Sequence, residues 1–171
     1  MAQARWQMLW RSVAVVVACA VGWSAQAQDI VVGQIGPFTV LPAPDAHEIN
    51  KGAKAYLAQV NAQGGINGRK VVLFEIDDKY SPDEFARQME VAMQRKPVAL
   101  LSPVGSATLQ KVLTDKLLDK HDVVILNAVP GAEVLREPGH PRLFHVRAGD
   151  RQQLEKIVQH ARTLGVTRMH V

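Results

Sequence analysis

Two periodicities of hydrophobic and polar positions alternate from residue 30 onward. Short runs rich in β-branched residues predict buried strands, and longer segments with apolar residues every three or four positions predict amphipathic helices. The predicted strands cover residues 30–35, 70–77, 98–101, 123–127 and 143–146, with a further run that begins at Arg168. Strands that alternate with helices form βαβ units, so the pattern predicts an α/β fold with a parallel sheet covered by helices on both faces.

Apolar stripes and end signals define the predicted helices more closely. The stripes expected to face the core are Ile49, Ala53, Tyr56, Leu57 and Val60; Leu109, Val112, Leu113 and Leu117; and Leu154, Ile157, Val158 and Ala161. Capping boxes predict three helix starts, at Asp45 with Glu48, Ser81 with Glu84, and Asp150 with Gln153. The glycine cluster of residues 64–68 predicts a turn into the next strand, because glycine tolerates positive φ.

The first 27 residues have the pattern of a secretory signal peptide. Arg5 and Arg11 precede an apolar run over residues 13–21, and Ala25-Gln26-Ala27 provides the small residues of a signal peptidase site. The apolar run is well short of the ~20 residues that span a bilayer, which argues against a membrane anchor. We therefore predict cleavage after Ala27 and export of the mature chain.

A lipoprotein site is the alternative at this end of the chain. Cys19 follows small residues and could become a lipidated N-terminus, but the residues after it stay apolar where a polar tether is expected. Cleavage after Ala27 would remove this only cysteine and all three tryptophans, so the exported chain would contain no disulfide.

Composition excludes some classes of protein. With 47% hydrophobic and 21% charged residues, the chain is globular and not intrinsically disordered. Loss of the predicted signal peptide would leave 18 basic against 16 acidic side chains, and these form no basic stripe along the sequence. We therefore predict no nucleic-acid partner.

The carboxyl ends of the predicted strands are the places to expect a ligand. Ligands of open parallel sheets bind there, and the loops in question are residues 36–39, 104–108 and 129–132. In the second loop, Ser106 is predicted to be a helix N-cap whose hydroxyl and neighbouring free N–H groups face a carboxylate. Gly105 favours this interpretation because it lets a ligand approach the backbone closely. The alternative is that Ser106 only caps its own helix.

Enzymatic chemistry is less well supported by the sequence. Ser106 lacks the G-x-S-x-G pattern, and no GxGxxG or P-loop motif is present. The six histidines are scattered without metal-binding spacing. Asp77 and Asp78 could be paired carboxylates for acid–base work or Mg²⁺, although a loop that leads to the Ser81 cap is the simpler explanation. The sequence therefore predicts a protein that is not an enzyme, with no cofactor and no metal.

Four stretches carry a resemblance to a known family. They read "IVVGQIGPFT", "KGAKAYLAQVNAQGGINGRKVVLFEIDD", "ALLSPVGSATLQKV" and "VVILNAVPGAEVLREPGHPRLFHVRAGD". They resemble the periplasmic binding proteins of branched-chain amino acid ABC transporters, the leucine/isoleucine/valine-binding type of the Rossmann-like type I periplasmic-binding fold. The segment "VNAQGGINGRKV" is the most specific of these matches.

The resemblance implies a two-lobed protein that closes on its ligand. Residues 28–146 would form most of the first lobe and residues 147–171 the start of a second, incomplete lobe. Because the resemblance covers less than half of the family's usual length, we expect a truncated chain that binds ligand weakly by itself. The implied function is an extracytoplasmic solute-binding component of an ABC importer, with an amino acid or similar small carboxylate as ligand and a membrane permease as partner. The alternative is a sensory or regulatory ligand-binding module of the same fold.

The resemblance also implies a set of ligand-binding residues. The carboxylate and ammonium of the ligand would be held by Gly105, Ser106 and Ala107 in one loop and by Val129 and Gly131 in another. In the first of the three loops, which is longer than in the amino acid binders, Phe38 or Leu41 would touch the apolar part of the ligand. Ser106 matches a serine of the family. The loop at residues 127–131 departs from the family pattern, because many relatives have small hydroxyl residues there, so a side-chain donor is lost.

Overall fold

The computed structural model describes residues 28–168 and contains a four-stranded parallel sheet. The strands are β1 (Ile30–Gly36), β2 (Val71–Asp77), β3 (Ala99–Leu101) and β4 (Val124–Leu126), in the spatial order β2-β1-β3-β4. This confirms the α/β prediction and four of the predicted strands, with small differences at their ends. The predicted signal peptide with Cys19, and all but the first residue of the run that begins at Arg168, lie outside the described residues.

The predicted strand at 143–146 is wrong. Leu143 forms only a single parallel bridge with Ile125, where the Phe144 N–H donates to the Ile125 carbonyl at 2.9 Å. A regular ladder would next use the N–H of Asn127, but Asn127 has a φ of 57° and the Phe144 carbonyl accepts from Ala128 instead. The ladder ends there because the left-handed residue takes β4 out of register with the neighbouring segment.

The helices fall close to the predicted positions, but two of the three predicted caps are wrong. The helices are α2 (Ala43–Ala62), α3 (Pro82–Met93), α4 (Ser106–Thr114), α5 (Leu117–Lys120) and α6 (Asp150–Thr163), with a 3₁₀ turn η1 (Glu133–Leu135). Ser81 caps α3 as predicted and accepts from the Glu84 N–H. α2 begins two residues before Asp45, and the cap of α6 is Gly149, whose N–H donates to the Gln152 side chain.

The glycine-rich turn after α2 is confirmed. Gly64, Gly65 and Gly68 all have positive φ, and the chain closes on itself through a bridge between Ile66 and Arg69. A Cβ at Gly65 would lie within van der Waals overlap of the Arg69 carbonyl. The turn therefore requires glycine at this position for space as well as for backbone conformation.

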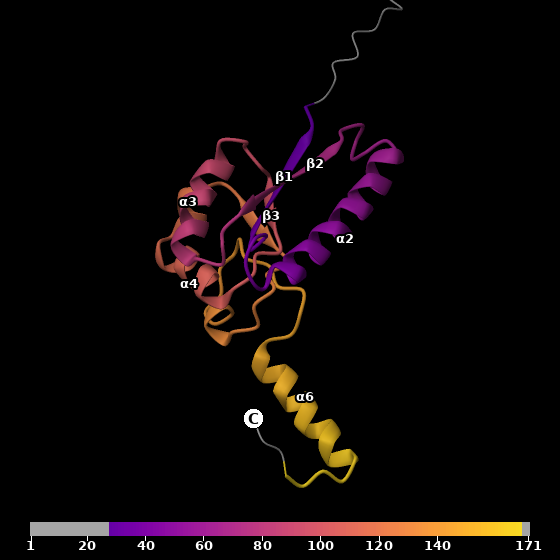
Figure 1. Ribbon diagram of the computed structural model, residues 1–171, viewed down its shortest axis with the longest axis vertical. Coiled ribbons are helices and arrows are strands. Elements are labelled where there is room, and N and C mark those ends of the chain that lie inside the picture. The colour runs from indigo at the N-terminus through magenta and orange to yellow at the C-terminus, as the bar shows by residue number, and fades with distance from the viewer. Residues whose placement is uncertain (1–27, 169–171) are drawn as a thin grey trace, which may run out of the picture.

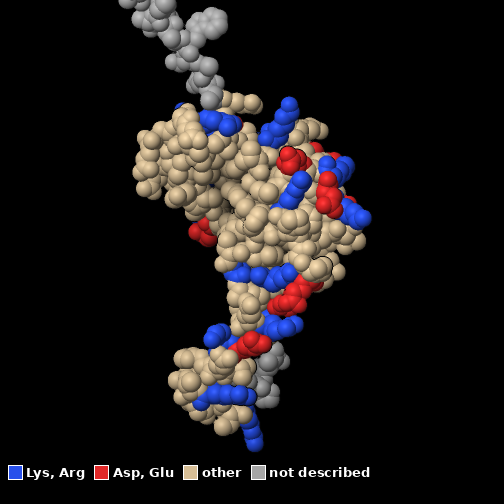
Figure 2. All heavy atoms as spheres, turned by 180° about the vertical axis from the view of Figure 1, so that it is seen from behind, with Lys and Arg blue, Asp and Glu red and all other residues tan. Residues whose placement is uncertain are grey.

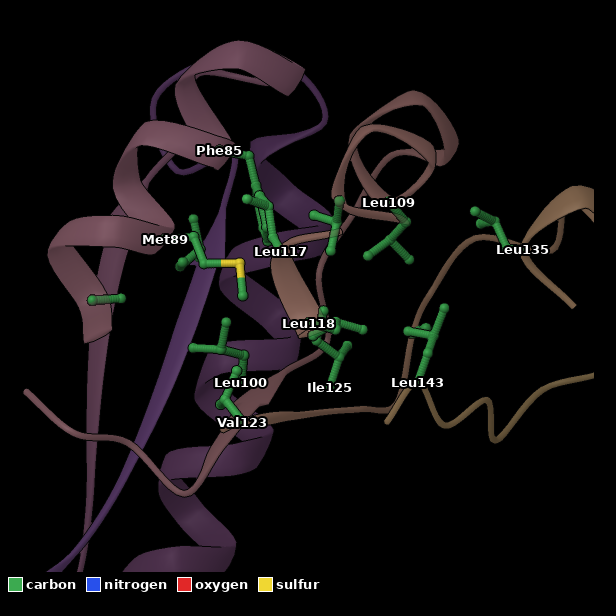
Figure 3. Close-up of a cluster of buried hydrophobic side chains, with 14 of the residues drawn as sticks. Phe85, Met89, Leu100, Leu109, Leu117, Leu118, Val123, Ile125, Leu135 and Leu143 are labelled. Carbon is green, nitrogen blue, oxygen red and sulfur yellow. The ribbon is translucent and has the colours of Figure 1, made fainter. Parts of the chain in front are cut away.

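The main core lies on one face of the sheet. Figure 1 shows α3 and α4 on this face and α2 on the opposite one. Figure 3 shows the side chains that meet there, among them Phe85 and Met89 from α3, Leu109 from α4, and Leu100 and Ile125 from the sheet. All five are essentially inaccessible to solvent. This cluster fixes the sheet, α3, α4 and α5 as one packed unit.

The opposite face of the sheet is covered only in part. α2 packs on β1 and β2 over a small cluster formed by Val32, Val71 and Ala99, with Leu57 against it. Beyond it, Leu126 of β4 is 38% exposed. The predicted apolar stripe of α2 is partly buried at Ile49, Ala53, Leu57 and Val60, but the prediction is wrong for Tyr56, which is 67% exposed.

α6 extends away from the packed unit, as Figure 1 shows. None of its residues is buried, and the predicted core stripe of Leu154, Ile157 and Val158 is exposed to solvent in the described part of the chain. The stripe prediction is thus wrong for this helix as it stands. Among residues 28–168, no helix is both long and apolar enough to cross a bilayer.

The two faces of the sheet should respond differently to the same substitution. Leu100→Ala removes a side chain that is 1% exposed in the main core, so we expect a loss of about 2–5 kcal/mol in the free energy of unfolding. Leu126→Ala, also on a strand but on the partly covered face, should cost about 1 kcal/mol or less. Urea denaturation of both variants measures this difference, and equal losses would contradict the one-sided core.

Candidate functional site

The strand order puts a topological switch point between the carboxyl ends of β1 and β3, the place where open parallel sheets have their ligand crevice. From β1 the chain runs to β2 on one side, and from β2 it crosses back to β3 on the other side of β1. The loops after β1 and β3 therefore lead to opposite faces of the sheet. Open parallel sheets bind their ligands at such a switch point. Two of the predicted site loops, with Phe38 and with Gly105–Ala107, border it.

The N-terminus of α4 presents free hydrogen-bond donors at this crevice. Gly105 is the N-cap, with φ 105° and ψ 118°, and Ser106 is the first helical residue, so the prediction of Ser106 as N-cap is wrong. Its side chain makes no capping bond, and the residue is exposed. The first helical bond of α4 is from the Leu109 N–H to the Gly105 carbonyl, which leaves the N–H groups of Ser106, Ala107 and Thr108 outside the helical ladder. These donors and the helix dipole favour an anion.

The loop after β1 is held by Asp77, the last residue of β2. Its carboxylate accepts from the Phe38 N–H at 2.8 Å and from the Thr39 hydroxyl at 2.5 Å. His47 of α2 adds a contact between its Nε2 and the Phe38 carbonyl at 2.9 Å, and the two rings meet edge to face. Phe38 is thus fixed by two side chains, Asp77 and His47, through three contacts. Val40 and Leu41, further along the loop, are exposed.

The loop after β4 is tied to the loop after β3. Asn127 donates to the Ser102 hydroxyl at 2.8 Å, and the Val129 N–H donates to the Pro103 carbonyl at 3.3 Å. The Val129 carbonyl accepts from Arg147, and the Gly131 carbonyl accepts from the Asp150 N–H. Most polar backbone groups proposed here for ligand binding are therefore already used within the chain, although a carbonyl can accept a second bond.

Asp77 and Asp78 have structural partners and opposite pKa shifts. Partial burial opposes ionisation of Asp77, but bonds from the Thr39 hydroxyl and from the Phe38 and Lys79 N–H groups outweigh it, so its pKa lies below the ordinary value. Asp78 is fully buried, and this burial raises its pKa from 3.8 to about 6. One of its oxygens accepts from the Tyr80 N–H at 2.8 Å, and the other has no partner among the described residues. The geometry supports the loop interpretation of this pair rather than a Mg²⁺ site.

Sequence reasoning missed Tyr80. This residue follows β2, has a φ of 55°, and lies with a ring carbon 3.2 Å from the point where a Cβ of Gly105 would be. The signal in the sequence was an aromatic residue two positions after Asp78, just beyond a strand end, on an edge that ligands use. The loop after β2 thus touches both loops that border the crevice, through Asp77 and through Tyr80.

The described residues contain no metal-binding cluster, and the face in Figure 2 carries charged side chains of both signs. No three His, Cys, Asp or Glu side chains within residues 28–168 come close enough together to hold a metal ion. On the face shown in Figure 2, Lys and Arg side chains lie among Asp and Glu. The histidines that the structure describes mostly bond to neighbouring groups, as His140 does with Asp119.

Comparison with known proteins identifies the family. The model of the periplasmic binding protein family matches residues 29–171. The chain belongs to this family. Among curated relatives, Leu/Ile/Val-binding protein homolog 3 of Brucella melitensis biotype 1 is 30% identical over 144 residues, which are 82% of this chain and 38% of that protein.

Solved structures agree with the fold. The extracellular ligand-binding receptor of Verminephrobacter eiseniae is 59% identical with a TM-score of 0.78, over 80% of this chain and 39% of that one. The substrate-binding periplasmic protein of Ralstonia solanacearum is 30% identical with a TM-score of 0.76, over 82% and 39%. The chain therefore spans well under half the length of the relatives it matches, and its fold is that of type I periplasmic binding proteins.

The two neighbouring aspartates should affect stability with opposite signs. Because the native pKa of Asp78 is above its unfolded value, its ionisation lowers stability as the pH rises from about 4 to 6, by about 2–3 kcal/mol. Asp78→Asn keeps the acceptor for Tyr80 but not the charge. We expect this variant to gain stability relative to the wild type over that window, as measured by urea denaturation at a series of pH values.

Asp77→Asn is the matched control. The native pKa of Asp77 is depressed, so its ionised form stabilises the protein above about pH 4, and this contribution is lost as the pH falls through the native pKa. The variant should be less stable than the wild type at neutral pH, with a difference that shrinks in acid. The opposite pKa shifts of Asp77 and Asp78 are wrong if the stability of both variants changes with pH in parallel with that of the wild type.

Proposed function

We propose that this protein is an extracytoplasmic solute-binding component of an ABC importer that binds an amino acid or a similar small carboxylate. The observation that carries the proposal is the free N-terminus of α4 at the switch point, with an exposed Ser106 hydroxyl and three N–H groups outside the helical ladder. Membership of the periplasmic binding protein family supports the class of function, and the Leu/Ile/Val-binding relative supports the class of ligand.

The proposed roles follow from the chemistry of each group. Gly105, Ser106 and Ala107 bind the carboxylate through N–H groups and the Ser106 hydroxyl, because charge-assisted bonds at a helix N-terminus are short and strong. Phe38 contacts the apolar part of the ligand from across the crevice. Val129 and Gly131 contribute backbone groups from the third loop. Binding involves hinge closure and no covalent chemistry.

Residues 28–146 form the first lobe in this proposal, and residues 147–171 begin the second. The signal peptide of residues 1–27 delivers the protein to the periplasm, and a membrane permease is its partner. Family membership supports this location.

A sensory or regulatory module of the same fold is the second candidate. The solved structure that is 59% identical is described as an extracellular ligand-binding receptor, and this description supports the sensory function as an alternative. The genes beside the coding sequence distinguish the two functions, because an importer is expected to lie beside a permease and an ATPase. Genes for a receptor or signalling partner in their place would favour the sensory function.

The ligand site can be tested by titrating the ¹⁵N-labelled protein with L-amino acids and small carboxylates. We expect the largest shifts at the backbone N–H groups of Ser106, Ala107 and Thr108. The dissociation constants should be about millimolar, near −4 kcal/mol, since the chain spans 38% of the relative and one lobe supplies most contacts. Shifts that cluster elsewhere would contradict the site, and micromolar affinity would contradict the expected weakness.

A matched pair of variants on α4 tests the role of the hydroxyl. Ser106→Ala should weaken carboxylate binding about tenfold, because a hydrogen bond to a charged group contributes about 1.5–3 kcal/mol. Thr114→Ala, at the exposed C-terminal end of the same helix, should leave affinity unchanged. Equal effects of the two substitutions would remove the Ser106 hydroxyl from the site.

A further inference from the structure

Tyr80 is held in a specific position on the loop after β2. Its backbone has a φ of 55°, a left-handed conformation that non-glycine residues seldom adopt. The Tyr80 N–H donates to the carboxylate of Asp78 at 2.8 Å, and Asp78 is fully buried. The next residue is fixed as well, since the Ser81 N–H donates to the Asp78 carbonyl at 3.0 Å and Ser81 caps α3. An unfavourable backbone conformation persists where the surroundings fix it in this way.

The ring of Tyr80 occupies space that a side chain at position 105 would need. A Cβ on Gly105 would lie 3.2 Å from Cε2 of Tyr80 and 2.9 Å from Oγ1 of Thr108. Gly105 is the N-cap of α4, so the ring lies against the first turn of the helix, one residue from Ser106. Glycine at 105 and tyrosine at 80 therefore form a matched pair at the N-terminus of α4.

About half of the Tyr80 residue remains open to solvent. Tyr80 is 47% exposed, although one edge of its ring is packed on Gly105. The loop after β1 adds further apolar surface at the same edge of the sheet, from Phe38 and from the exposed Val40 and Leu41. Small-molecule sites commonly combine a few convergent polar donors with apolar and aromatic walls. The α4 N–H groups provide the donors here, and the ring provides a wall beside them.

We propose that Tyr80 is a specificity-determining residue of this site, whose ring selects carboxylates that carry an aromatic or flat apolar group. The inference rests on the proposed function, because it requires a carboxylate at the N-terminus of α4. A carboxylate bound there can extend its remaining atoms along the exposed part of the Tyr80 ring as well as toward Phe38. Aromatic rings favour offset or edge contacts with each other, and such pairs contribute beyond the apolar area that they bury.

The sequence provides an internal control for the experiment. Tyr56 and Tyr80 are the only tyrosines of the chain, and Tyr56 lies 67% exposed on α2. Protein labelled with ring-¹³C tyrosine therefore gives signals from two sites, which a Tyr80→Phe variant assigns. The probes are acetate and phenylacetate, which share the carboxylate and differ by a phenyl group. We expect phenylacetate to shift the Tyr80 signals at concentrations that leave those of Tyr56 unchanged, and acetate to shift the α4 N–H groups without the same effect on the ring.

Two substitutions separate the ring from the backbone. Tyr80→Asn removes the ring and retains a residue that tolerates positive φ, so folding should be preserved, as a thermal melt checks. We expect it to weaken phenylacetate binding at least tenfold while acetate binding changes less than twofold. Tyr80→Phe should bind both probes within twofold of the wild type.

The outcomes distinguish this inference from the proposed function. If acetate and phenylacetate both leave the N–H groups of α4 unshifted, the proposed function fails. If both shift those groups but Tyr80→Asn weakens neither, or weakens both equally, the site stands and selection by Tyr80 is wrong. A shift of Tyr56 equal to that of Tyr80 would likewise contradict the inference.

Discussion

Burial of apolar side chains on one face of the parallel sheet is the constraint on which the rest of the structure depends. Phe85 and Met89 of α3 and Leu109 of α4 pack on Leu100 and Ile125, and together they fix the positions of β3, β4 and both helices. Because this cluster is packed without freedom to shift, the ends of the strands are fixed in space as well. The loops of the candidate site begin from these ends, so the core determines the site geometry indirectly.

Left-handed residues carry the chain from the fixed strands into the loops. Ser102 after β3, Asn127 after β4, and Lys79 with Tyr80 after β2 all have φ between 51° and 57°. Each such residue is expected to cost about 1 kcal/mol or more. Hydrogen bonds between loops offset this strain, from Asn127 to Ser102 and from the loop after β1 to Asp77. Hydrogen bonds therefore join the loops at this edge of the sheet, and they hold the backbone N–H groups of the candidate site in fixed orientations.

The parts that could be predicted from the sequence are those decided by local chemistry. Periodicity located four strands, Ser81-Pro82 located the start of α3, and the turn after α2 followed from its glycines. The strand at 143–146 was predicted from composition, but Asn127 in a left-handed conformation ends the pairing. Asparagine tolerates that conformation, but the sequence alone does not say which asparagine adopts it. The apolar residues Leu154, Ile157 and Val158 of α6 have helical spacing, but this spacing does not determine which surface, if any, covers them. For the candidate site, strand ends indicated the loops of Phe38 and Ser106, which the structure places beside the switch point. The contact of Tyr80 with Gly105 depends on two loops 25 residues apart meeting in three dimensions.

The loop after β4 links the candidate site to α6 through polar contacts. Gly131 accepts from the Asp150 N–H at 2.8 Å, and a Cβ on Gly131 would overlap the carboxylate of Asp150, so the start of α6 is in direct contact with this loop. Glu133 accepts from the Arg151 N–H, and Arg147 donates to the Val129 carbonyl and to Gln153. Hydrogen bonds of this kind can exchange with water at small net cost, unlike a buried apolar contact. A reorientation of α6 would break the bond from the Asp150 N–H to the Gly131 carbonyl and the bond from the Arg151 N–H to Glu133. The start of α6 is thus positioned by the same loop that contains Val129 and Gly131.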